Sequence, residues 1–568
     1  MGTVGKRIVL AATDTESNEY QRSTWRQMLL ATLPARFESY LGVDWSCKNE
    51  IWPDGQAKYV PAGLRVVESL LRQKFPVEEI AVCYTDQLGD FIGHNTRVVA
   101  VHAHNPLGIT FATDIYSYFF GRDAEPINAA EFRRLITHPV LRAHKHHLKL
   151  IVGGPGAWQI EKKNLQDEWQ VDTLVHGEAE DVALPLFEAA YRGEPLPRSV
   201  TGYSPDLSHI PRMAGRATLG AVEITRGCGR GCQFCSVALR GGKSIPLEQI
   251  LQNVRVQVAG GADTILLTTE DIFLYEQGPR FDTNIPALKR LLAEVAAVSG
   301  VKHVMLTHGT IAPAVKEPEV IAELSEIAVG MSVNRHSDST HPEKRYANLF
   351  VGLETGSVRL FNQFMKGKAY PYRPGQWPDV VLKGMQVLNR HNWFPFCTFI
   401  VGLPGETRED TKQSLDLLFA LRDAKWCVIP TLFVPLGDTR LEKKLGAKLV
   451  ELSDLQWEFF FTCWRYNLDF FRRDPLVHWK FNLGIPIYYY LMGRRLFGRE
   501  MKYPLYRLGH FPEWFLRRRL YLDLSNGRRP KFHAPEHVAI PPERMRPTIP
   551  ELAEIQPTLA GGEERAAD

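Results

Sequence analysis

Three cysteines in one short stretch constrain this chain more than any other feature. Cys228, Cys232 and Cys235 follow a predicted strand, with glycines at positions 227, 229 and 231. Thiols at this spacing converge on one centre only if the loop wraps around it, and thiolates are the usual ligands of iron–sulfur clusters. Glycine allows the tight backbone approach of such a loop. The spacing therefore predicts a [4Fe–4S] cluster with one iron left open.

Two alternatives for these cysteines are weaker. A zinc site needs a fourth ligand at compatible spacing, and the sequence offers none. Loop cysteines without a ligand role are the other alternative. The remaining five cysteines are scattered, so each is read as a small buried hydrophobe rather than as half of a disulfide: Cys47, Cys83, Cys397, Cys427 and Cys463. This usage predicts a reducing, cytoplasmic compartment.

The length of 568 residues exceeds what a single core supports, so several domains are expected. In residues 1–200, β-branched apolar runs such as 96–103 alternate with helical patterns, which predicts an α/β domain of Rossmann type with a parallel sheet. Residues 193–215 contain Pro and Ser and are interpreted as a linker. Ligands of such sheets bind beyond the carboxyl ends of the strands.

A second series of strands and helices spans residues 215–445. Six strand candidates joined by helical segments predict a partial (β/α)6 barrel, similar to a TIM barrel, whose chemistry lies at the carboxyl ends of the strands. Residues 446–540 form a basic, aromatic and mostly helical C-terminal domain in this interpretation. Residues 541–568 are expected to be a disordered tail.

The cysteine segment resembles the cluster motif of the radical S-adenosylmethionine (SAM) superfamily. That motif is C-x3-C-x2-C with an aromatic residue before the last cysteine, here Phe234. The resemblance covers residues 220–440 and implies that SAM coordinates the open iron. It also implies that Glu270 contacts the SAM amino group and that Glu354 approaches the SAM ribose. The alternative for both glutamates is a solvated carboxylate at a helix N-terminus. The turn GLPGET at 402–407 is similar to the family as well.

Residues 1–200 resemble the cobalamin-binding (B12-binding) domain fused to one class of these enzymes. The resemblance rests on Gly153 and Gly154 after a strand and on VHGEAE at 175–180. Cobalamin domains often carry D-x-H-x-x-G, whose histidine ligates cobalt. Here His102 replaces the Asp, and His104 stands four residues before Gly108 instead of three. Cobalamin contacts are thus implied at His104, Gly108, Gly153 and Gly154, while cobalt ligation by His104 is disfavoured. A Rossmann-like domain that binds nothing is the alternative.

The segment 480–519 combines aromatic residues with Lys and Arg. It is compatible with a domain that caps the barrel mouth, with a peripheral contact at the inner membrane face, and less well with nucleic-acid binding. No uncharged apolar run is long enough to span a bilayer. A nucleic-acid partner is not expected. The implied electron donor is a low-potential protein such as flavodoxin or ferredoxin.

Together the resemblances imply an enzyme that reductively cleaves SAM to a 5′-deoxyadenosyl radical and functionalises an unactivated carbon. With cobalamin, the expected reaction is C-methylation, that of a B12-dependent methyltransferase. The alternative is carbon–carbon coupling or ring formation on a lipid or isoprenoid substrate at the membrane surface. A methylthiotransferase is disfavoured, because that class has a second cysteine cluster in its N-terminal domain and only Cys47 and Cys83 lie there.

Overall fold

The computed structural model describes residues 4–19, 35, 49–110, 113, 125–203, 206–207, 210–333, 335–336, 344–437, 439–448 and 451–473. Cys47, the segment 480–519 and the tail 541–568 lie outside the described residues. By its contacts the chain divides into two units. The first comprises Met1–Ile224, Ile245–Leu267 and Ala297–His303, and the second Thr225–Ser244, Thr268–Ala296 and Val304–Asp568.

The first unit contains a six-stranded parallel sheet in the order β2-β1-β3-β4-β5-β6. Its inner strands are continuous apolar runs, as expected for parallel strands that are covered on both faces. The order reverses between β1 and β3, which makes the gap between their carboxyl ends the switch point of the sheet. The strands are β1 (Ile8–Ala12), β2 (Ile80–Tyr84), β3 (Val98–His102), β4 (Lys149–Gly153), β5 (Thr173–Gly177) and β6 (Ser199–Gly202).

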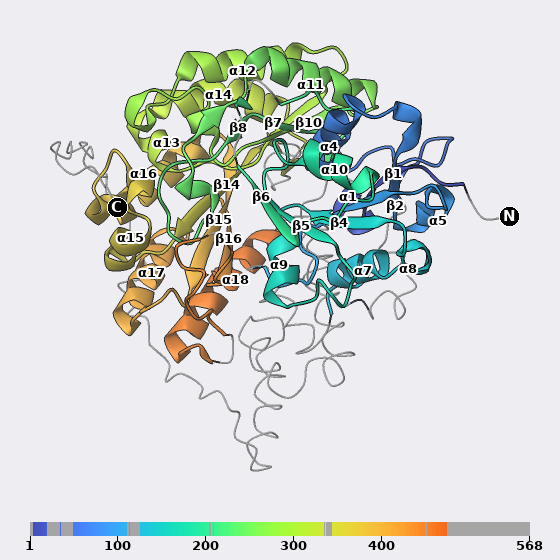
Figure 1. Ribbon diagram of the computed structural model, residues 1–568. Helices are drawn as coiled ribbons and strands as arrows, with labels where there is room; N and C mark the ends of the chain where they lie inside the picture. Colours follow the sequence, from blue (N-terminus) through green and yellow to red (C-terminus); the bar gives the residue numbers. More distant parts are fainter. Residues whose placement is uncertain are drawn as a thin grey trace. The chain divides into compact units, whose positions relative to one another are not determined.

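Helices cover both faces of this sheet (Figure 1). Helices α7, α8 and α9 pack on the face that carries Val99 and Val101, whereas α4 and α10 pack on the face that carries Val98 and Ala100. The alternation follows from the two-residue period of a strand. The helices of this part are α1 (Asp14–Ser17), α4 (Ala62–Arg72), α5 (Leu88–Phe91), α7 (Ile127–Ile136), α8 (Pro139–His144), α9 (Ala157–Lys162) and α10 (Ala183–Tyr191).

The segment 193–215 is not a plain linker. It contains β6, which pairs with β5 at the edge of the sheet. The linker interpretation failed here because β6 is short, largely exposed and without apolar alternation. Farther along, Ser69 on α4 donates a hydrogen bond to the Arg212 carbonyl at 2.7 Å, and the Met213 N–H donates to Asn253 Oδ1 at 2.9 Å. These contacts tie the segment to α4 and to α11 (Leu247–Ala259).

The second series of strands forms two three-stranded sheets, β11-β10-β7 and β14-β15-β16. A parallel bridge from His308, just after β11, to Phe350 in β14 joins them, so the order β7-β10-β11-β14-β15-β16 follows the chain, as expected for a partial barrel. Two short pairs, β8–β9 and β12–β13, accompany them. The strands are β7 (Ala221–Glu223), β8 (Thr225–Arg226), β9 (Lys243–Ser244), β10 (Thr264–Thr268), β11 (His303–Leu306), β12 (Arg335–His336), β13 (Lys344–Arg345), β14 (Ala347–Glu354), β15 (Trp393–Val401) and β16 (Cys427–Leu432).

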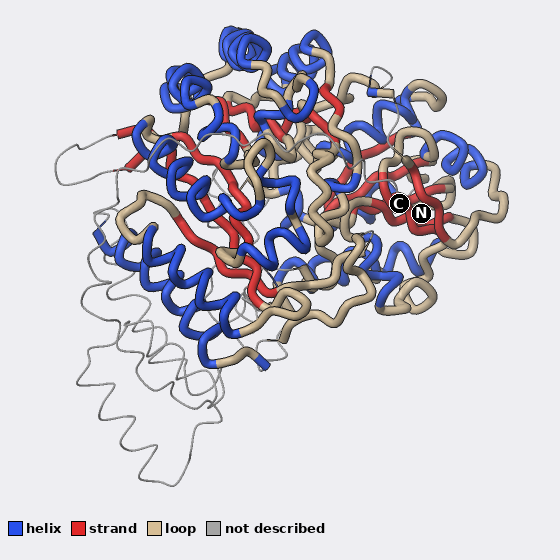
Figure 2. The backbone as a smooth tube through the Cα atoms, turned by 90° about the vertical axis from the view of Figure 1, so that its left-hand side faces the viewer, coloured by secondary structure: helices blue, strands red, loops and turns tan. Residues whose placement is uncertain are grey.

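Helices alternate with these strands along the chain and flank them in Figure 2. Besides α11 they are α12 (Ile285–Ala297), α13 (Ala312–Lys316), α14 (Pro318–Gly330), α15 (Val358–Phe364), α16 (Trp377–Arg390), α17 (Arg408–Ala420) and α18 (Asp454–Arg473). The expected α/β class, with a Rossmann-type sheet followed by a partial barrel, is confirmed. The boundaries predicted for the separate domains stay predictions.

Candidate functional site

The cysteine loop is a compact turn fixed by its own backbone. The Cys228 N–H donates to the carbonyls of Val237 and Arg240, both at 3.1 Å, and the Gly231 N–H donates to Ala238 at 2.9 Å. The three loop glycines all have positive φ, between 73° and 76°. A Cβ at Gly227 would lie 2.7 Å from the carbonyl oxygen of Gly241, so only glycine closes the loop here.

The thiols of this loop are sheltered from solvent. Cys228 and Cys232 are buried and Cys235 is half-buried. Burial raises the pKa of Cys228 to about 12 and that of Cys232 to about 11. Binding of iron therefore has to displace protons from these thiols. Three soft sulfur donors on one glycine-closed loop suit an iron–sulfur cluster.

A buried ion pair joins the same loop to the segment after β10. Arg230, between the first two cysteines, places Nε and Nη2 3.2 Å from Asp271 Oδ2, and the two side chains are only 1% and 0% exposed. Asp271 also accepts hydrogen bonds from the Thr310 hydroxyl at 2.7 Å and from the Phe273 N–H at 3.2 Å. The pair links the cluster loop to the segments after β10 and β11. Sequence reasoning missed it, although Arg230 stands inside the motif.

A second buried ion pair lies at the end of β14. Lys368 Nζ is 2.7 Å from Glu354 Oε1, and the Thr398 hydroxyl donates to Glu354 Oε2 at 3.1 Å. Burial opposes the charge on Lys368, but Glu354 and the thiols of Cys232 and Cys235 raise its pKa above the ordinary value. The structure thus brings the predicted Glu354 close to the cluster loop through Lys368. No sequence motif points to Lys368, which lies fourteen residues from its partner.

The other predicted SAM residues lie by the same loop. Glu270, exposed after β10, is close enough to Cys235 that its charge raises the pKa of that thiol, after the larger effect of burial. Phe234 is half-buried within the loop. The structure therefore brings Glu270 and Glu354 into the neighbourhood of the three cysteines, while their contacts with SAM stay predictions.

The GLPGET turn has a structural role in the described residues. Glu406 accepts hydrogen bonds from the Gly402 N–H at 2.5 Å and from the Thr411 hydroxyl at 2.7 Å. Thr407 is the N-cap of α17 and forms a capping box with Asp410. Arg359 on α15 pairs with Asp410 at 2.6 Å. The turn therefore fixes the start of α17 against α15.

At the switch point of the N-terminal sheet, one carboxylate organises the loop after β3. Glu16, on α1 directly after β1, lies 2.9 Å from His102 Nδ1 and accepts hydrogen bonds from the N–H groups of His104 at 2.8 Å and Asn105 at 3.3 Å. Burial alone would raise the pKa of Glu16, but these hydrogen bonds bring it below the ordinary value. The histidine with a carboxylate partner is thus His102, whereas the His104 side chain is exposed.

The predicted glycines bring neighbouring loops of this edge together. Gly153 ends β4, and a Cβ at Gly154 would lie 2.8 Å from the Ala103 carbonyl oxygen. A Cβ at Gly108 would lie 2.7 Å from Pro126 Cγ. The loops after β1, β3 and β4 therefore meet at one edge, as the resemblance implies for a bound corrinoid. The donor set there, a histidine oriented by a carboxylate, fits a metal-containing ring.

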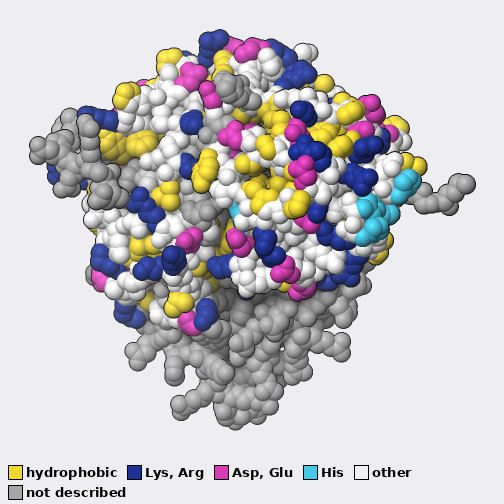
Figure 3. Space-filling model, in the orientation of Figure 1, with side chains coloured by type: hydrophobic (Ala, Val, Ile, Leu, Met, Phe, Trp, Pro, Cys, Tyr) yellow, Lys and Arg dark blue, Asp and Glu magenta, His cyan; other side chains and the backbone are white. Residues whose placement is uncertain are grey.

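A histidine patch is visible on the N-terminal unit (Figure 3). The ring of His147 contacts the rings of His144 and His146. His147 Nε2 lies 3.3 Å from the Gly93 carbonyl oxygen. Within the described residues no group of three or more His, Cys, Asp or Glu side chains is arranged to hold a single metal ion. Among the described residues, no helix is long and apolar enough to cross a membrane.

Comparisons with curated proteins point to methylthiotransferases and one uncharacterised protein. The chain is 25% identical to an uncharacterised protein of Methanopyrus kandleri, over 66% of this chain and 72% of that one. It is 26% identical to tRNA-2-methylthio-N(6)-dimethylallyladenosine synthase of Bifidobacterium longum subsp. infantis, over 48% of this chain and 51% of that one. It is 29% identical to the ribosomal protein uS12 methylthiotransferase of Geobacter sulfurreducens, over 34% and 38%. This chain thus spans about half or less of these two methylthiotransferases.

Among solved structures, the chain is similar to the radical SAM methyltransferase TsrM of Kitasatospora setae, determined with cobalamin and a [4Fe–4S] cluster bound. The TM-score is 0.48 at 15% identity, with 77% of this chain and 74% of that one covered. A second structure of that enzyme, with tryptophan and a SAM analogue, gives a TM-score of 0.49.

The family comparison covers the cluster loop and most of the partial barrel. Residues 222–418 match the model of the radical SAM superfamily. The matched range includes Cys228, Cys232, Cys235, Glu270 and Glu354. A domain of this family works with a [4Fe–4S] cluster and SAM. Residues 222–418 of this chain are therefore a radical SAM domain.

Proposed function

We propose that this chain is a cobalamin-dependent radical SAM methyltransferase that adds a methyl group to an unactivated carbon. The observation that carries the proposal is the pairing, in one chain, of the cysteine loop with a doubly wound sheet whose switch-point edge holds Glu16 and His102. Ligands of doubly wound sheets bind at such a switch point.

When bound, the cluster and SAM supply a carbon radical, and the corrinoid supplies the methyl group. The residues of the protein bind and orient the cofactors and the substrate, and they exclude water from the site. Cys228, Cys232 and Cys235 would hold the cluster, and the buried Arg230–Asp271 pair fixes the loop between the first two cysteines. Glu354 is held in one orientation by Lys368 and Thr398 and would present its carboxylate to SAM.

On the N-terminal side, Glu16 fixes the ring of His102 through Nδ1. This leaves Nε2 as the nitrogen that can face a ligand, the arrangement in which carboxylates orient metal-binding histidines. Gly153 and Gly154 permit close approach of the neighbouring loops. In this proposal, His102 rather than His104 is the residue that contacts the corrinoid ring.

The experiment is a cofactor count on the full chain, purified without oxygen and supplied with iron, sulfide and hydroxocobalamin. The proposal expects about four irons per chain and one tightly bound corrinoid. The variant with Cys228, Cys232 and Cys235 changed to Ala should lose the iron and keep the corrinoid. The control Cys427→Ala, a buried thiol on β16, should keep both.

Four irons without corrinoid would overturn the methyltransferase proposal and favour the coupling or cyclisation alternative. A corrinoid-loaded protein must also consume two SAM molecules for each methylated product. One SAM per product in the presence of corrinoid would contradict the proposal as well.

The second candidate function is methylthio transfer, which the similarity to the tRNA and ribosomal-protein enzymes favours. That class requires a second cysteine cluster in the N-terminal domain. Cys83 is 0% exposed in β2, packed in the core beneath α5 and α7, and burial raises the pKa of its thiol well above the ordinary value. About eight irons per chain would favour this candidate, whereas about four would exclude it.

A further inference from the structure

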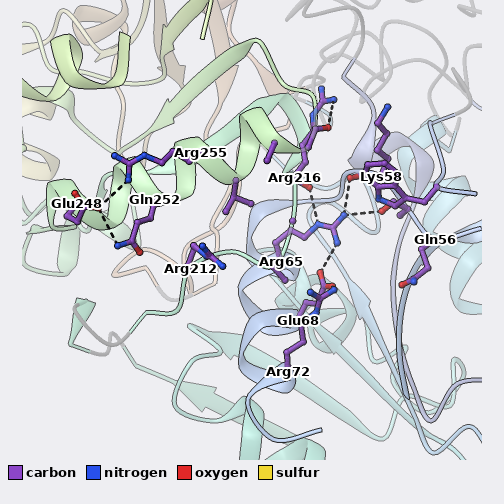
Figure 4. Close-up of a pocket in the computed structure, with 17 residues that line it drawn as sticks. Gln56, Lys58, Arg65, Glu68, Arg72, Arg212, Arg216, Glu248, Gln252 and Arg255 are labelled. Carbon is purple, nitrogen blue, oxygen red and sulfur yellow. Dashed lines mark hydrogen bonds and ion pairs between the residues drawn. The ribbon is translucent and has the colours of Figure 1, made fainter. Parts of the chain in front are cut away.

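A polar cavity of about 820 Å³ lies within the first unit, between α4, α11 and the segment 212–217. Figure 4 shows the side chains that line it on these elements. Its lining includes six cationic side chains but only two glutamates. The cations are Lys58, Arg65, Arg72, Arg212, Arg216 and Arg255. None of the residues that line it belongs to the cluster loop or to the Glu16 site.

The floor of the cavity is fixed by Arg65. Its guanidinium is 5% exposed and donates to Glu68 at 2.7 Å and to the carbonyls of Arg216, Ala57 and Lys58 at 3.0, 3.0 and 3.1 Å. Glu68 also pairs with Arg72 at 2.5 Å. The Nε, Nη1 and Nη2 atoms of Arg65 each donate to one or more of these groups. Arg65 therefore stabilises the floor of the cavity and is not available to a ligand.

The segment that carries Arg212 and Arg216 is held from both sides. Ser69 on α4 binds the Arg212 carbonyl, and on α11 the side chains of Asn253 and Gln257 accept from the N–H groups of Met213 and Ala217, the latter at 2.7 Å. The backbone that carries the two arginines is therefore held in place, which lowers part of the entropy cost of binding a ligand.

Two arginines in the cavity keep capacity for a ligand. Arg212 is exposed, and its guanidinium makes no hydrogen bond or ion pair among the described residues. In the same part of the chain Arg255 pairs only with the exposed Glu248, at 3.2 Å. Arg216 is 10% exposed, pairs with Glu19 and stacks on Tyr59, so it adds positive charge to the wall without facing a ligand directly. A wall with this excess of positive charge favours an anion.

We propose that this cavity binds a small anion that carries two linked phosphate groups. Arg212 and Arg255 come from different elements, so each can bind one phosphate with its planar fork. The volume falls in the range of small-molecule sites and exceeds what one phosphate needs. Trp52, 43% exposed, lines the same cavity and offers a face for a nucleobase. The ligand is inorganic pyrophosphate or a nucleoside diphosphate.

The test is isothermal titration of the full chain with pyrophosphate and, separately, with ADP. Wild type should bind with one site per chain. The double variant Arg212→Ala/Arg255→Ala should bind at least about tenfold more weakly, because two charge-assisted contacts are lost. The matched control is Arg290→Ala on α12, an exposed arginine paired with Glu294 that does not line the cavity. It should change affinity less than about twofold.

The outcomes separate clearly. Tighter binding of ADP than of pyrophosphate assigns the site to a nucleotide, and equal binding assigns it to the diphosphate alone. Unchanged affinity in the double variant overturns the proposal, as does the absence of saturable binding of either anion. Ligand should also raise the unfolding temperature of wild type but not of the double variant. Both changed arginines are exposed, so the ligand-free variant should unfold at the wild-type temperature.

Discussion

The cluster loop and the switch point of the N-terminal sheet are built in different ways. At the cluster loop, the three thiols come from one continuous stretch, and buried ion pairs from other elements surround them. At the switch point of the N-terminal sheet, the groups come from separate loops, and a single carboxylate, Glu16, gathers His102, His104 and Asn105. The thiols of the cluster loop are therefore neighbours in the sequence, whereas the groups at the switch point are far apart in it.

The difference shows what holds each of these two places together. Around the cluster loop, Arg230 and Lys368 each neutralise a carboxylate that is almost fully buried, so removal of one partner leaves a buried charge behind. At the switch point, Glu16 is held mainly by hydrogen bonds from a histidine and two backbone N–H groups. We therefore expect larger losses of stability from charge changes around the cluster loop, called the cluster edge below. We expect larger changes in ligand binding at the switch point of the N-terminal sheet, called the sheet edge below.

The largest expected effect is at Arg230. Arg230→Met leaves the Asp271 carboxylate buried without its cation and should cost about 3–5 kcal/mol of the free energy of unfolding. Urea unfolding of the full chain measures it. Asp271→Asn in the same background should recover part of the loss, because it removes the unpaired charge. A loss below about 1 kcal/mol would show that water or relaxation replaces the pair and would remove the contrast between the edges.

A pH effect should be centred on Asp14 at the sheet edge. Burial, with Asp86 and Glu131 nearby, raises its pKa to about 7, although Arg134 acts in the opposite sense. An acid with a raised pKa in the folded state stabilises the fold below its unfolded pKa. This contribution is lost as the pH rises toward 7. Asp14→Asn should therefore gain stability relative to wild type between pH 4.5 and 7.5, by about 3 kcal/mol.

Hydrogen exchange of the amides in β1 and β3 measures this change in stability within the N-terminal unit alone. Asp90→Asn, an exposed carboxylate on α5, is the control and should give no such pH-dependent difference. If the gain of Asp14→Asn were the same at both pH values, the raised pKa of Asp14 would be refuted.

Glu16→Gln tests whether the sheet edge serves ligand binding. The amide still accepts hydrogen bonds from the backbone N–H groups but no longer orients His102 as a carboxylate does. Retention of hydroxocobalamin should fall about tenfold, the usual cost of losing such an orienting group. The visible spectrum of the bound corrinoid should shift too. Glu50→Gln, in which the exposed Glu50 loses its ion pair with Lys58, should retain corrinoid like wild type.

The smallest effect is expected at Thr407. Thr407→Ala removes the N-cap of α17 and should cost about 1 kcal/mol, with cluster content unchanged, because the GLPGET turn is structural in this fold. Arg408→Ala, one residue later and exposed, should be neutral. A variant that keeps its stability but loses SAM binding would instead give the turn a direct role at the site.

Much of the fold could be predicted because its signals are local. The run at 96–103 predicted β3, and the runs at 264–268 and 396–401 predicted β10 and most of β15. Strand β6 was missed because an exposed edge strand carries no apolar pattern. The cysteine loop was recognised since its ligands and glycines lie within nine residues of chain, from 227 to 235.

The rest of the site depends on contacts between residues far apart in the chain. Arg230 and Asp271 are 41 positions apart, and Glu16 and His102 are 86 apart. No local pattern encodes such pairs. For the same reason the motif D-x-H-x-x-G drew attention to His104, although the carboxylate that would accompany a ligating histidine comes from the loop after β1 and contacts His102. The acid that is missing from the motif is thus supplied by Glu16, from another part of the chain.

The hydrogen bonds that hold the segment 212–217 against α11 limit where this chain can be divided into fragments. Gln257 is completely buried on α11, and its side-chain oxygen is occupied by the Ala217 N–H. Asn253 depends in the same way on Met213. A fragment that began near residue 220 would keep every cluster ligand yet leave two buried amides without their partners. The natural place to cut this protein is therefore not the start of its radical SAM domain, because α11 depends on residues that precede that start.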